Sequence, residues 1–138
     1  MMRKQQGFTL IELLVVVSLL AIVSTAAVLA MPSPARNQLE EEALRMTTLM
    51  EIARAQSRAS GLPVFLRVKE HGFEFDGSSA VRKLSGRWLH AGTTASSQVL
   101  QLGPEPVIAA QRLRLTGADA QQVVIATDGV LPFDVQEP

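Results

Sequence analysis

One carboxylate stands inside the long apolar stretch near the N-terminus of this chain. Glu12 falls in a run of 24 residues, from Phe8 to Met31, that holds no other charged side chain. As a helix this run would be about 36 Å long, enough to cross the hydrocarbon core of a bilayer with some tilt. An ionised carboxylate in such a helix costs roughly 2.5 to 3.5 kcal/mol at the bilayer centre and less near its end. Glu12 is therefore expected to have a partner of opposite charge.

The residues before Glu12 indicate what that partner could be. If the chain is cut after Gly7, the new amine of Phe8 lies four residues before Glu12 on the same helical face, in this molecule or in a neighbouring one. Arg3 and Lys4 precede the apolar run. By the positive-inside rule these charges hold the short head in the cytoplasm, so the rest of the chain is expected outside.

A cleaved secretory signal and a plain membrane anchor are the competing interpretations of this segment. A secretory signal has an uncharged apolar core of about 7 to 15 residues before a small-x-small cleavage site. Val28-Leu29-Ala30 could supply such a site, but the apolar core before it is too long. A plain anchor would carry Glu12 by chance.

The stretch from Gly7 to Val17 reads Gly-Phe-Thr-Leu-Ile-Glu-Leu-Leu-Val-Val-Val. It resembles, residue for residue, the prepilin-type signal of type IV pilins and type II secretion pseudopilins. The resemblance implies that a prepilin peptidase cuts between Gly7 and Phe8 on the cytoplasmic side and N-methylates Phe8. Glu12 then becomes the fifth residue of the mature chain, where the family pairs it with a neighbouring subunit's N-terminal amine during assembly.

Composition fits a small exported domain behind this segment. The chain has 138 residues, which leaves roughly a hundred for one domain with a modest core. Cysteine is absent, so disulfides and thiolate metal sites are excluded. From Ala35 onward there are 11 basic and 12 acidic residues, so the totals imply no strongly charged face.

A second helix is expected after the prolines at positions 32 and 34. Pro32 and Pro34 should kink the helix, with Ser33 as N-cap and Pro34 as first helical residue. Gly61 and Pro63 predict that this helix ends near Ser60. The expected core-facing stripe is Leu39, Ala43, Met46, Met50, Ala53 and Ser57, widened by Leu49 and Ile52. The expected outer face is Glu40, Glu41, Glu42, Arg45, Glu51, Arg54 and Arg58.

Beyond Leu62 the pattern shortens to that of strands and turns. The sequence predicts a hairpin of strands 63–69 and 73–76, joined at 70–72. A flexible loop is expected at 92–97, a turn at 128–129, and Trp88 as a core anchor with a partner-facing surface as the alternative. The other predicted strands are 81–84, 87–90, 99–102, 107–108, 112–116, 122–126 and 130–135.

One N-terminal helix followed by strands predicts an α+β domain in which the helix packs on an antiparallel β-sheet. The motifs Arg54-Ala55-Gln56, Gly61 to Val64, Trp88 and Thr127-Asp128-Gly129 with Pro132-Phe133 resemble the GspH type of minor pseudopilin. FimT- and FimU-like minor pilins share much of this pattern. The expected organisation is a leader peptide at 1–7, a transmembrane and filament-core helix at 8–31 and its second half at 32–60. A periplasmic β-rich region at 61–138 then forms one domain with 35–60.

The resemblance implies a structural subunit at the tip of a periplasmic pseudopilus that supports export of folded proteins. Its implied partners are the other minor pseudopilins, the major pseudopilin, the inner-membrane assembly platform and the prepilin peptidase, with residues 8–31 in the inner membrane. The alternative is a minor pilin of a type IV pilus, which primes assembly or takes up DNA. DNA capture predicts a basic stripe. The sequence offers only two small clusters, one of Arg82, Lys83 and Arg87 and one of Arg112 and Arg114, so nucleic acid is not favoured.

Residues suited to catalysis or to metal binding do not form a recognisable pattern. His71 and His90 have no neighbouring cysteine and no serine and aspartate partners in the sequence. Asp119, Asp128 and Asp134 are too scattered for a calcium loop, and glycine-rich phosphate loops are absent. We therefore expect no catalysis, no cofactor and no metal.

Overall fold

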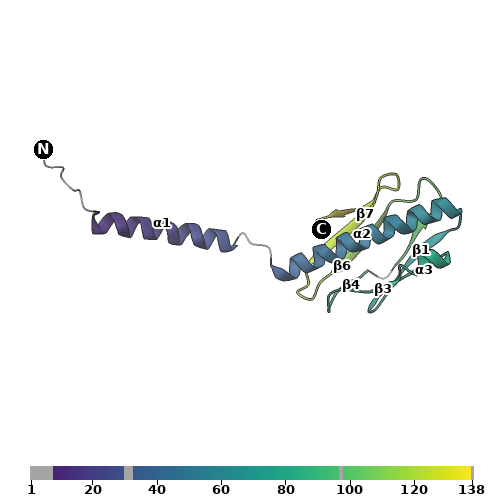
Figure 1. Cartoon of the computed structure of the whole chain (residues 1–138), viewed down its shortest axis with the longest axis horizontal. Coiled ribbons are helices and arrows are strands. Elements are labelled where there is room, and N and C mark those ends of the chain that lie inside the picture. The colour runs from purple at the N-terminus through teal and green to yellow at the C-terminus, as the bar shows by residue number, and fades with distance from the viewer. Residues whose placement is uncertain (1–7, 30–32, 97, 138) are drawn as a thin grey trace. The chain divides into compact units, whose positions relative to one another are not determined.

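The computed structural model describes residues 8–29, 33–96 and 98–137, which Figure 1 draws in colour. The chain divides into two compact units, Met1–Pro32 and Ser33–Pro138. The predicted leader with Gly7, and Pro32 of the predicted kink, lie outside the described residues.

The described helix of the first unit is α1 (Leu10–Leu29), and every side chain from residue 10 to 28 is exposed. Its stretch Leu10–Val28 has a mean hydropathy of 2.5 and is long enough to cross a membrane. Three hydroxyls donate hydrogen bonds to the carbonyl oxygen four residues earlier, at 2.7 to 2.8 Å: Ser18, Ser24 and Thr25. These polar groups are satisfied within the helix, as a hydrocarbon environment requires.

The second unit begins with helix α2 (Pro34–Ser60). The Ser33 hydroxyl accepts a hydrogen bond from the backbone N–H of Arg36, and Pro34 occupies the first turn. At the other end Gly61 adopts φ of 69° and donates its N–H to the carbonyl of Ser57 at 2.9 Å. The predicted start and end of this helix are confirmed, because the cap residues provide the hydrogen bonds and the left-handed conformation that helix ends need.

The strands form two antiparallel sheets of four strands each, where the sequence predicted one sheet. The first sheet has the order β3-β2-β1-β5 and the second β4-β6-β7-β8. The bounds in the first sheet are β1 (Val64–Lys69), β2 (Gly72–Asp76), β3 (Gly86–Arg87) and β5 (Val99–Gly103). Those in the second are β4 (Thr94–Ala95), β6 (Gln111–Thr116), β7 (Gln122–Thr127) and β8 (Asp134–Gln136).

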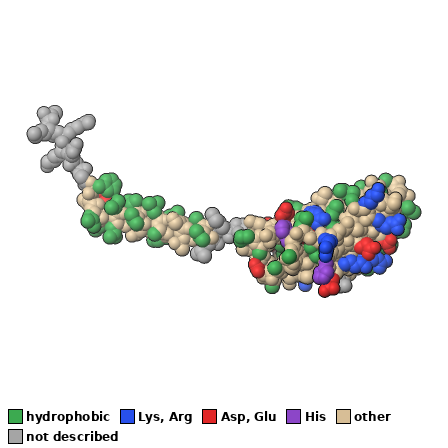
Figure 2. All heavy atoms as spheres, turned by 60° about the horizontal axis from the view of Figure 1, so that its bottom comes forward, with side chains coloured by type: hydrophobic (Ala, Val, Ile, Leu, Met, Phe, Trp, Pro, Cys, Tyr) green, Lys and Arg blue, Asp and Glu red, His purple; other side chains and the backbone are tan. Residues whose placement is uncertain are grey.

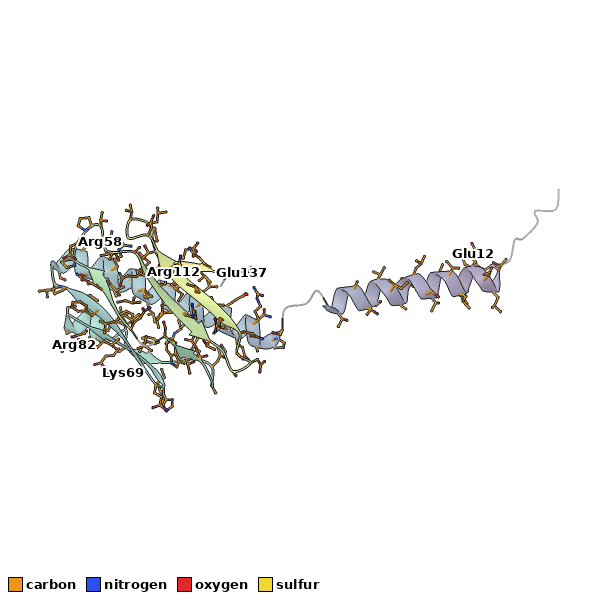
Figure 3. The ribbon with its side chains drawn as sticks, turned by 180° about the vertical axis from the view of Figure 1, so that it is seen from behind. Glu12, Arg58, Lys69, Arg82, Arg112 and Glu137 are labelled. Carbon is orange, nitrogen blue, oxygen red and sulfur yellow. The ribbon has the colours of Figure 1, made fainter. Side chains whose placement is uncertain are left out.

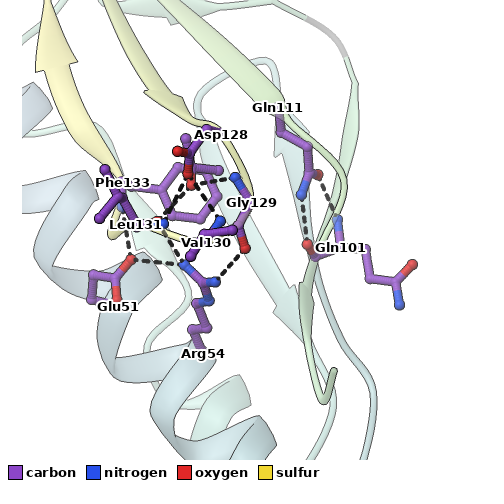
Figure 4. Close-up of polar contacts among 10 residues, drawn as sticks. Glu51, Arg54, Gln101, Gln111, Asp128, Gly129, Val130, Leu131 and Phe133 are labelled. Carbon is purple, nitrogen blue, oxygen red and sulfur yellow. Dashed lines mark hydrogen bonds and ion pairs between the residues drawn. The ribbon is translucent and has the colours of Figure 1, made fainter. Parts of the chain in front are cut away.

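After β5 the chain passes from the first sheet to the second, where it forms β6. Pro104 and Pro106 follow β5 and have no N–H for a ladder, so the chain leaves the first sheet there. The side-chain amide of Gln111 then takes the place of a neighbouring strand. Its Oε1 accepts the N–H of Gln101 at 3.0 Å and its Nε2 donates to the carbonyl of Gln101 at 2.8 Å, as Figure 4 shows.

Helix α2 packs across both sheets and forms the core with them (Figure 1). All six residues of the predicted core stripe are buried, and Leu49 packs against the core. Ile52 is 42% exposed and contributes little. Trp88 is half-buried and packs against Phe73 with ring centroids 5.3 Å apart, so its predicted place at the core is confirmed. The buried core residues run from Leu39 to Phe133, so Ser33–Pro138 contains a complete core and should fold without α1.

Several strand predictions in the middle of the chain were wrong. Residues 81–84 do not form a strand, because Val81 and Arg82 end helix α3 (Ser79–Arg82), which has Ser78 as N-cap and buries Val81. Residues 107–108 are not in a strand, since the prolines before them interrupt pairing. Of the strand predicted at 87–90, only Arg87 is in a strand, β3 (Gly86–Arg87). The loop predicted at 92–97 contains the short strand β4. The strand predicted at 130–135 is β8, which begins at Asp134.

Candidate functional site

The first turn of α1 is fixed by Thr9. The Thr9 hydroxyl accepts the N–H of Glu12 at 3.3 Å, and the Thr9 carbonyl accepts the N–H of Leu13 at 3.2 Å. Thr9 is therefore the N-cap and Glu12 the third helical residue, which is the spacing of a capping box. A carboxylate in the first turn also interacts favourably with the helix dipole, by typically about 0.3 to 1 kcal/mol. The spacing Thr-x-x-Glu in residues 9–12 is the sequence signal from which this N-cap could have been predicted.

Glu12 is exposed on α1, where Figure 3 labels it. Phe8, which precedes the helix, is 75% exposed. Among residues 8–29, 33–96 and 98–137, no cation lies within ion-pair distance of the Glu12 carboxylate. The Glu12 carboxylate and the backbone nitrogen of Phe8 thus lie at the same end of α1.

A second cluster lies where α2 meets the segment between β7 and β8. Arg54 is 1% exposed, yet the sequence placed it on the outer face of α2. Its guanidinium donates to the carbonyl of Gly129 at 2.9 Å and to that of Leu131 at 3.1 Å (Figure 4). Glu51, 3.8 Å from Arg54, accepts the N–H of Phe133 at 2.9 Å. These two residues attach the segment to the helix.

The segment 128–133 also carries its own hydrogen bonds. One oxygen of Asp128 accepts the N–H groups of Val130 and Leu131 at 2.9 and 2.8 Å. These bonds, first that of Leu131, lower the pKa of Asp128, because they favour its charged form. The Thr127 hydroxyl donates to the carbonyl of Leu131 at 2.7 Å and accepts the N–H of Gly129 at 3.0 Å.

Gly129 joins this segment to the one that follows β5. Its carbonyl accepts the N–H of Ile108 at 3.1 Å. Its φ is 98°, and a Cβ at this position would lie 1.9 Å from the carbonyl oxygen of Ile108, so only glycine fits. We call residues 104–110 and 128–133 the loop pair. Its exposed apolar side chains are Val107, Val130 and Leu131, at 60%, 65% and 64%.

Glu42 is the second buried charge that the sequence placed on the outer face. It is fully buried and accepts the N–H of Leu89 at 2.5 Å and that of His90 at 3.3 Å. Arg45 donates to Glu42 at 3.1 Å and to the carbonyl of Arg87 at 3.1 Å. The helix therefore fixes the backbone that follows β3 in the same manner as it fixes the loop pair.

Sequence spacing could have identified both buried charges. Glu42 is three residues after Leu39 and four before Met46, while Arg54 is four after Met50 and three before Ser57. These are the spacings of one helical face, so both side chains belong beside the core stripe. Buried charges at such positions require hydrogen-bond partners, which backbone groups of the loops supply here.

The candidate catalytic and metal-binding residues are not brought together. His71 lies on a turn beside Glu70 at 3.9 Å, and His90 lies 3.1 Å from Glu41. No group of three His, Cys, Asp or Glu side chains suited to a metal occurs among the residues that the structure describes. Asp119, Asp128 and Asp134 therefore do not form a shared cation site within that part of the chain.

The two basic clusters belong to different parts of the domain. Arg82 and Lys83 lie at α3 and Arg87 on β3 beside the first sheet, whereas Arg112 and Arg114 lie on β6 of the second sheet. Figure 3 labels Arg82 and Arg112 on separate elements. On the face drawn in Figure 2, cationic side chains are interspersed with anionic ones. This distribution does not form the continuous basic stripe that nucleic acid would require.

Comparison with known proteins agrees with the N-terminal geometry. Residues 2–28 match the family model described as the prokaryotic N-terminal methylation motif. Over 73 residues the chain is 36% identical to the type II secretion system protein H of Aeromonas hydrophila. The matched region covers 52% of this chain and 40% of the relative, so it spans less than half of that protein's length. No solved structure gives a significant match.

These findings fit the structure, in which an N-terminal apolar helix is followed by a second helix and antiparallel sheets in an α+β arrangement like that of type IV pilins. The chain thus carries the N-terminal methylation motif and is similar to protein H over about half of its own length.

Proposed function

We propose that this chain is a minor pseudopilin of a type II secretion system. It is a structural subunit at the tip of the periplasmic pseudopilus and supports export of folded proteins across the outer membrane. The observation that carries the proposal is the position of Glu12 in the first turn of a membrane-length apolar helix, four residues after Phe8 and five after Gly7. Similarity to the secretion protein H favours the secretion filament over a type IV pilus.

The chain first serves as a membrane-stored precursor. Helix α1 spans the inner membrane, with the leader in the cytoplasm and the domain Ser33–Pro138 in the periplasm. The prepilin peptidase hydrolyses the bond between Gly7 and Phe8, which leaves a carboxylate on Gly7 and an amine on Phe8. A methyl group then passes from a sulfonium methyl donor to this amine, which gives up a proton. Cleavage removes Arg3 and Lys4 and leaves one cationic amine at the beginning of α1.

Glu12 then pairs with the N-terminal amine of a neighbouring subunit and sets the register between helices. At 4 Å and an effective dielectric constant of 20, such a pair is worth about 4 kcal/mol, comparable to the roughly 2.5 to 3.5 kcal/mol needed to hold the charge in an apolar medium. A slip by one helical turn moves the charges about 5.4 Å further apart and removes about 2 kcal/mol. One charge pair therefore selects one register.

The periplasmic domain supplies contacts rather than catalysis. Its proposed partners are the other minor pseudopilins, the major pseudopilin and the inner-membrane assembly platform. The buried Arg54 and Glu42 hold loops against α2, which suits a subunit that must present fixed surfaces.

Mass spectrometry of the full chain, produced with a prepilin peptidase and extracted from membranes, tests the processing. The intact mass should correspond to a chain that begins at Phe8 and carries one added methyl group. A chain that still begins at Met1, or one that begins near Met31, would overturn the proposal.

Replacement of Glu12 tests the pairing separately from the processing. Glu12→Ala should be cut and methylated normally but should enter the filament poorly, because the neighbouring amine has lost its partner. Glu12→Asp, which keeps the charge on a shorter side chain, is the matched control and should enter better than the alanine variant. Normal incorporation of Glu12→Ala would remove the pairing from the mechanism.

A further inference from the structure

The loop pair holds apolar side chains that its own fold does not bury. Val107, Val130 and Leu131 are each at least 60% exposed, and they lie on two segments joined by the hydrogen bond from Ile108 to Gly129. A hollow of about 430 Å³ adjoins Leu131 and is lined also by Asp128, Pro132 and Phe133 together with residues of β7 and β8. An apolar side chain of a partner could enter this hollow beside Leu131.

The backbone beneath these side chains is fixed before any partner arrives. Arg54 binds the carbonyl groups of Gly129 and Leu131, and Asp128 binds the N–H groups of Val130 and Leu131 (Figure 4). A surface that is already ordered loses little conformational freedom on binding, so more of the interaction free energy appears as affinity. Ordered exposure of this kind is typical of a contact surface.

The charges around the loop pair restrict what can bind. The loop pair, residues 104–110 and 128–133, contains Glu105 and Asp128 and no Lys or Arg, and Asp134 of β8 follows it directly. The three carboxylates repel phosphates, so nucleic acid and anionic lipid surfaces are excluded as occupants. A second copy of the same surface is excluded too, because a symmetric contact would bring two sets of carboxylates together.

We propose that the loop pair is a docking surface for a different protein subunit, one that presents an apolar side chain bordered by Lys or Arg. The identity of this partner as another subunit of the secretion filament rests on the proposed function. The surface chemistry follows from the loop pair alone. Failure of the docking test would therefore leave the processing at Gly7 and Phe8 standing.

Titration of the isotopically labelled domain Ser33–Pro138, followed by NMR, tests the surface. The probe is a short amphipathic peptide of leucine and lysine, and the control peptide has the same pattern with glutamate in place of lysine. The lysine peptide should shift the amide signals of 105–109 and 128–134, whereas the glutamate peptide should not. Shifts centred elsewhere, or equal effects of the two peptides, would overturn the proposal.

Matched variants separate docking from folding. Leu131→Ser should weaken binding of the lysine peptide by about tenfold, while Leu89→Ser, at another exposed apolar position, should not. Glu105→Gln combined with Asp134→Asn should weaken binding mainly at low salt, since these charges lie at the rim. Unchanged binding by Leu131→Ser in a domain with native spectra would refute the surface. Concentration-dependent dimers of the free domain that Leu131→Ser abolishes would refute the choice of partner.

Discussion

Gly129 and Gly61 offer a matched pair of substitutions for testing how the loop pair is held. Both residues have positive φ, 98° for Gly129 and 69° for Gly61. Alanine at Gly61 therefore meets a backbone penalty of about 1 to 2 kcal/mol, and alanine at Gly129, whose φ lies further from the left-handed helical region, meets at least as large a penalty. A Cβ on Gly61 would meet no atom within 4 Å, whereas one on Gly129 would lie 1.9 Å from the carbonyl oxygen of Ile108.

The difference between the two variants measures the contact between the two segments. To relieve the clash in Gly129→Ala, residues 128–131 must move away from Ile108. That movement breaks the hydrogen bond between Ile108 and Gly129 and weakens the two bonds from Arg54. A neutral bond contributes about 0.5 to 1.5 kcal/mol and a bond to a charged group about 1.5 to 3 kcal/mol. Gly129→Ala should therefore destabilise the domain by at least about 2 kcal/mol more than Gly61→Ala.

Urea unfolding of the domain Ser33–Pro138 measures this difference. With a slope of about 1 to 3 kcal/mol per molar urea, the midpoint of Gly129→Ala should lie roughly 1 M below that of Gly61→Ala. The slopes of the two variants should agree, because both unfold the same core. Equal midpoints would refute the reasoning, since they would mean that the loop pair moves apart at little cost.

Two further substitutions examine the charges of the same cluster. Arg54→Met should lower the free energy of unfolding by about 3 kcal/mol, because it removes two charge-assisted bonds to loop carbonyls. Arg58→Met, one turn later and exposed, is the control and should change the free energy of unfolding little. Equal urea midpoints for the two variants would contradict the stabilising role of Arg54. The pKa of Asp128 is lowered in the folded domain, so its contribution to stability is present above the ordinary aspartate pKa and is lost as the pH falls through the folded value. Below about pH 4 the wild-type domain should therefore lose stability more steeply than Asp128→Asn in a pH series of urea unfolding, and parallel profiles would contradict this.

The regular parts of the fold could be predicted because local rules agree with the packing there. The spacing from Leu39 to Ser57 follows one helical face, and Ser33 and Gly61 are cap residues, so α2 was predicted from start to end. The strand β7 is buried along nearly its whole length, and the hairpin of β1 and β2 has a short turn between apolar runs. In each case the pattern of apolar residues alone determines the element.

The parts that could not be predicted depend on contacts between distant residues. The spacing of Arg54 and Glu42 places both beside the core stripe, but their backbone partners at 87–90 and 129–131, which make burial favourable, are far away in the sequence. The helix α3 replaces a predicted strand because the Ser78 hydroxyl caps a four-residue turn that buries Val81. The division into two sheets depends on where chains lie in space, which no local pattern around Pro104 specifies. The cleavage position and the pairing of Glu12 remain predictions.

The glutamine at the start of β6 occupies part of an open sheet edge, which is the kind of surface at which strands of different molecules can pair. Three of the four outer edges of the sheets are strands of only two or three residues, β3, β4 and β8, which offer little to an incoming strand. The fourth, β5, has five residues, and there the Gln111 side chain occupies both backbone groups of Gln101. An unoccupied edge of that length is a template for strand pairing between molecules. In the middle of that edge, a single side-chain amide occupies the two backbone groups with which a strand of another molecule would pair.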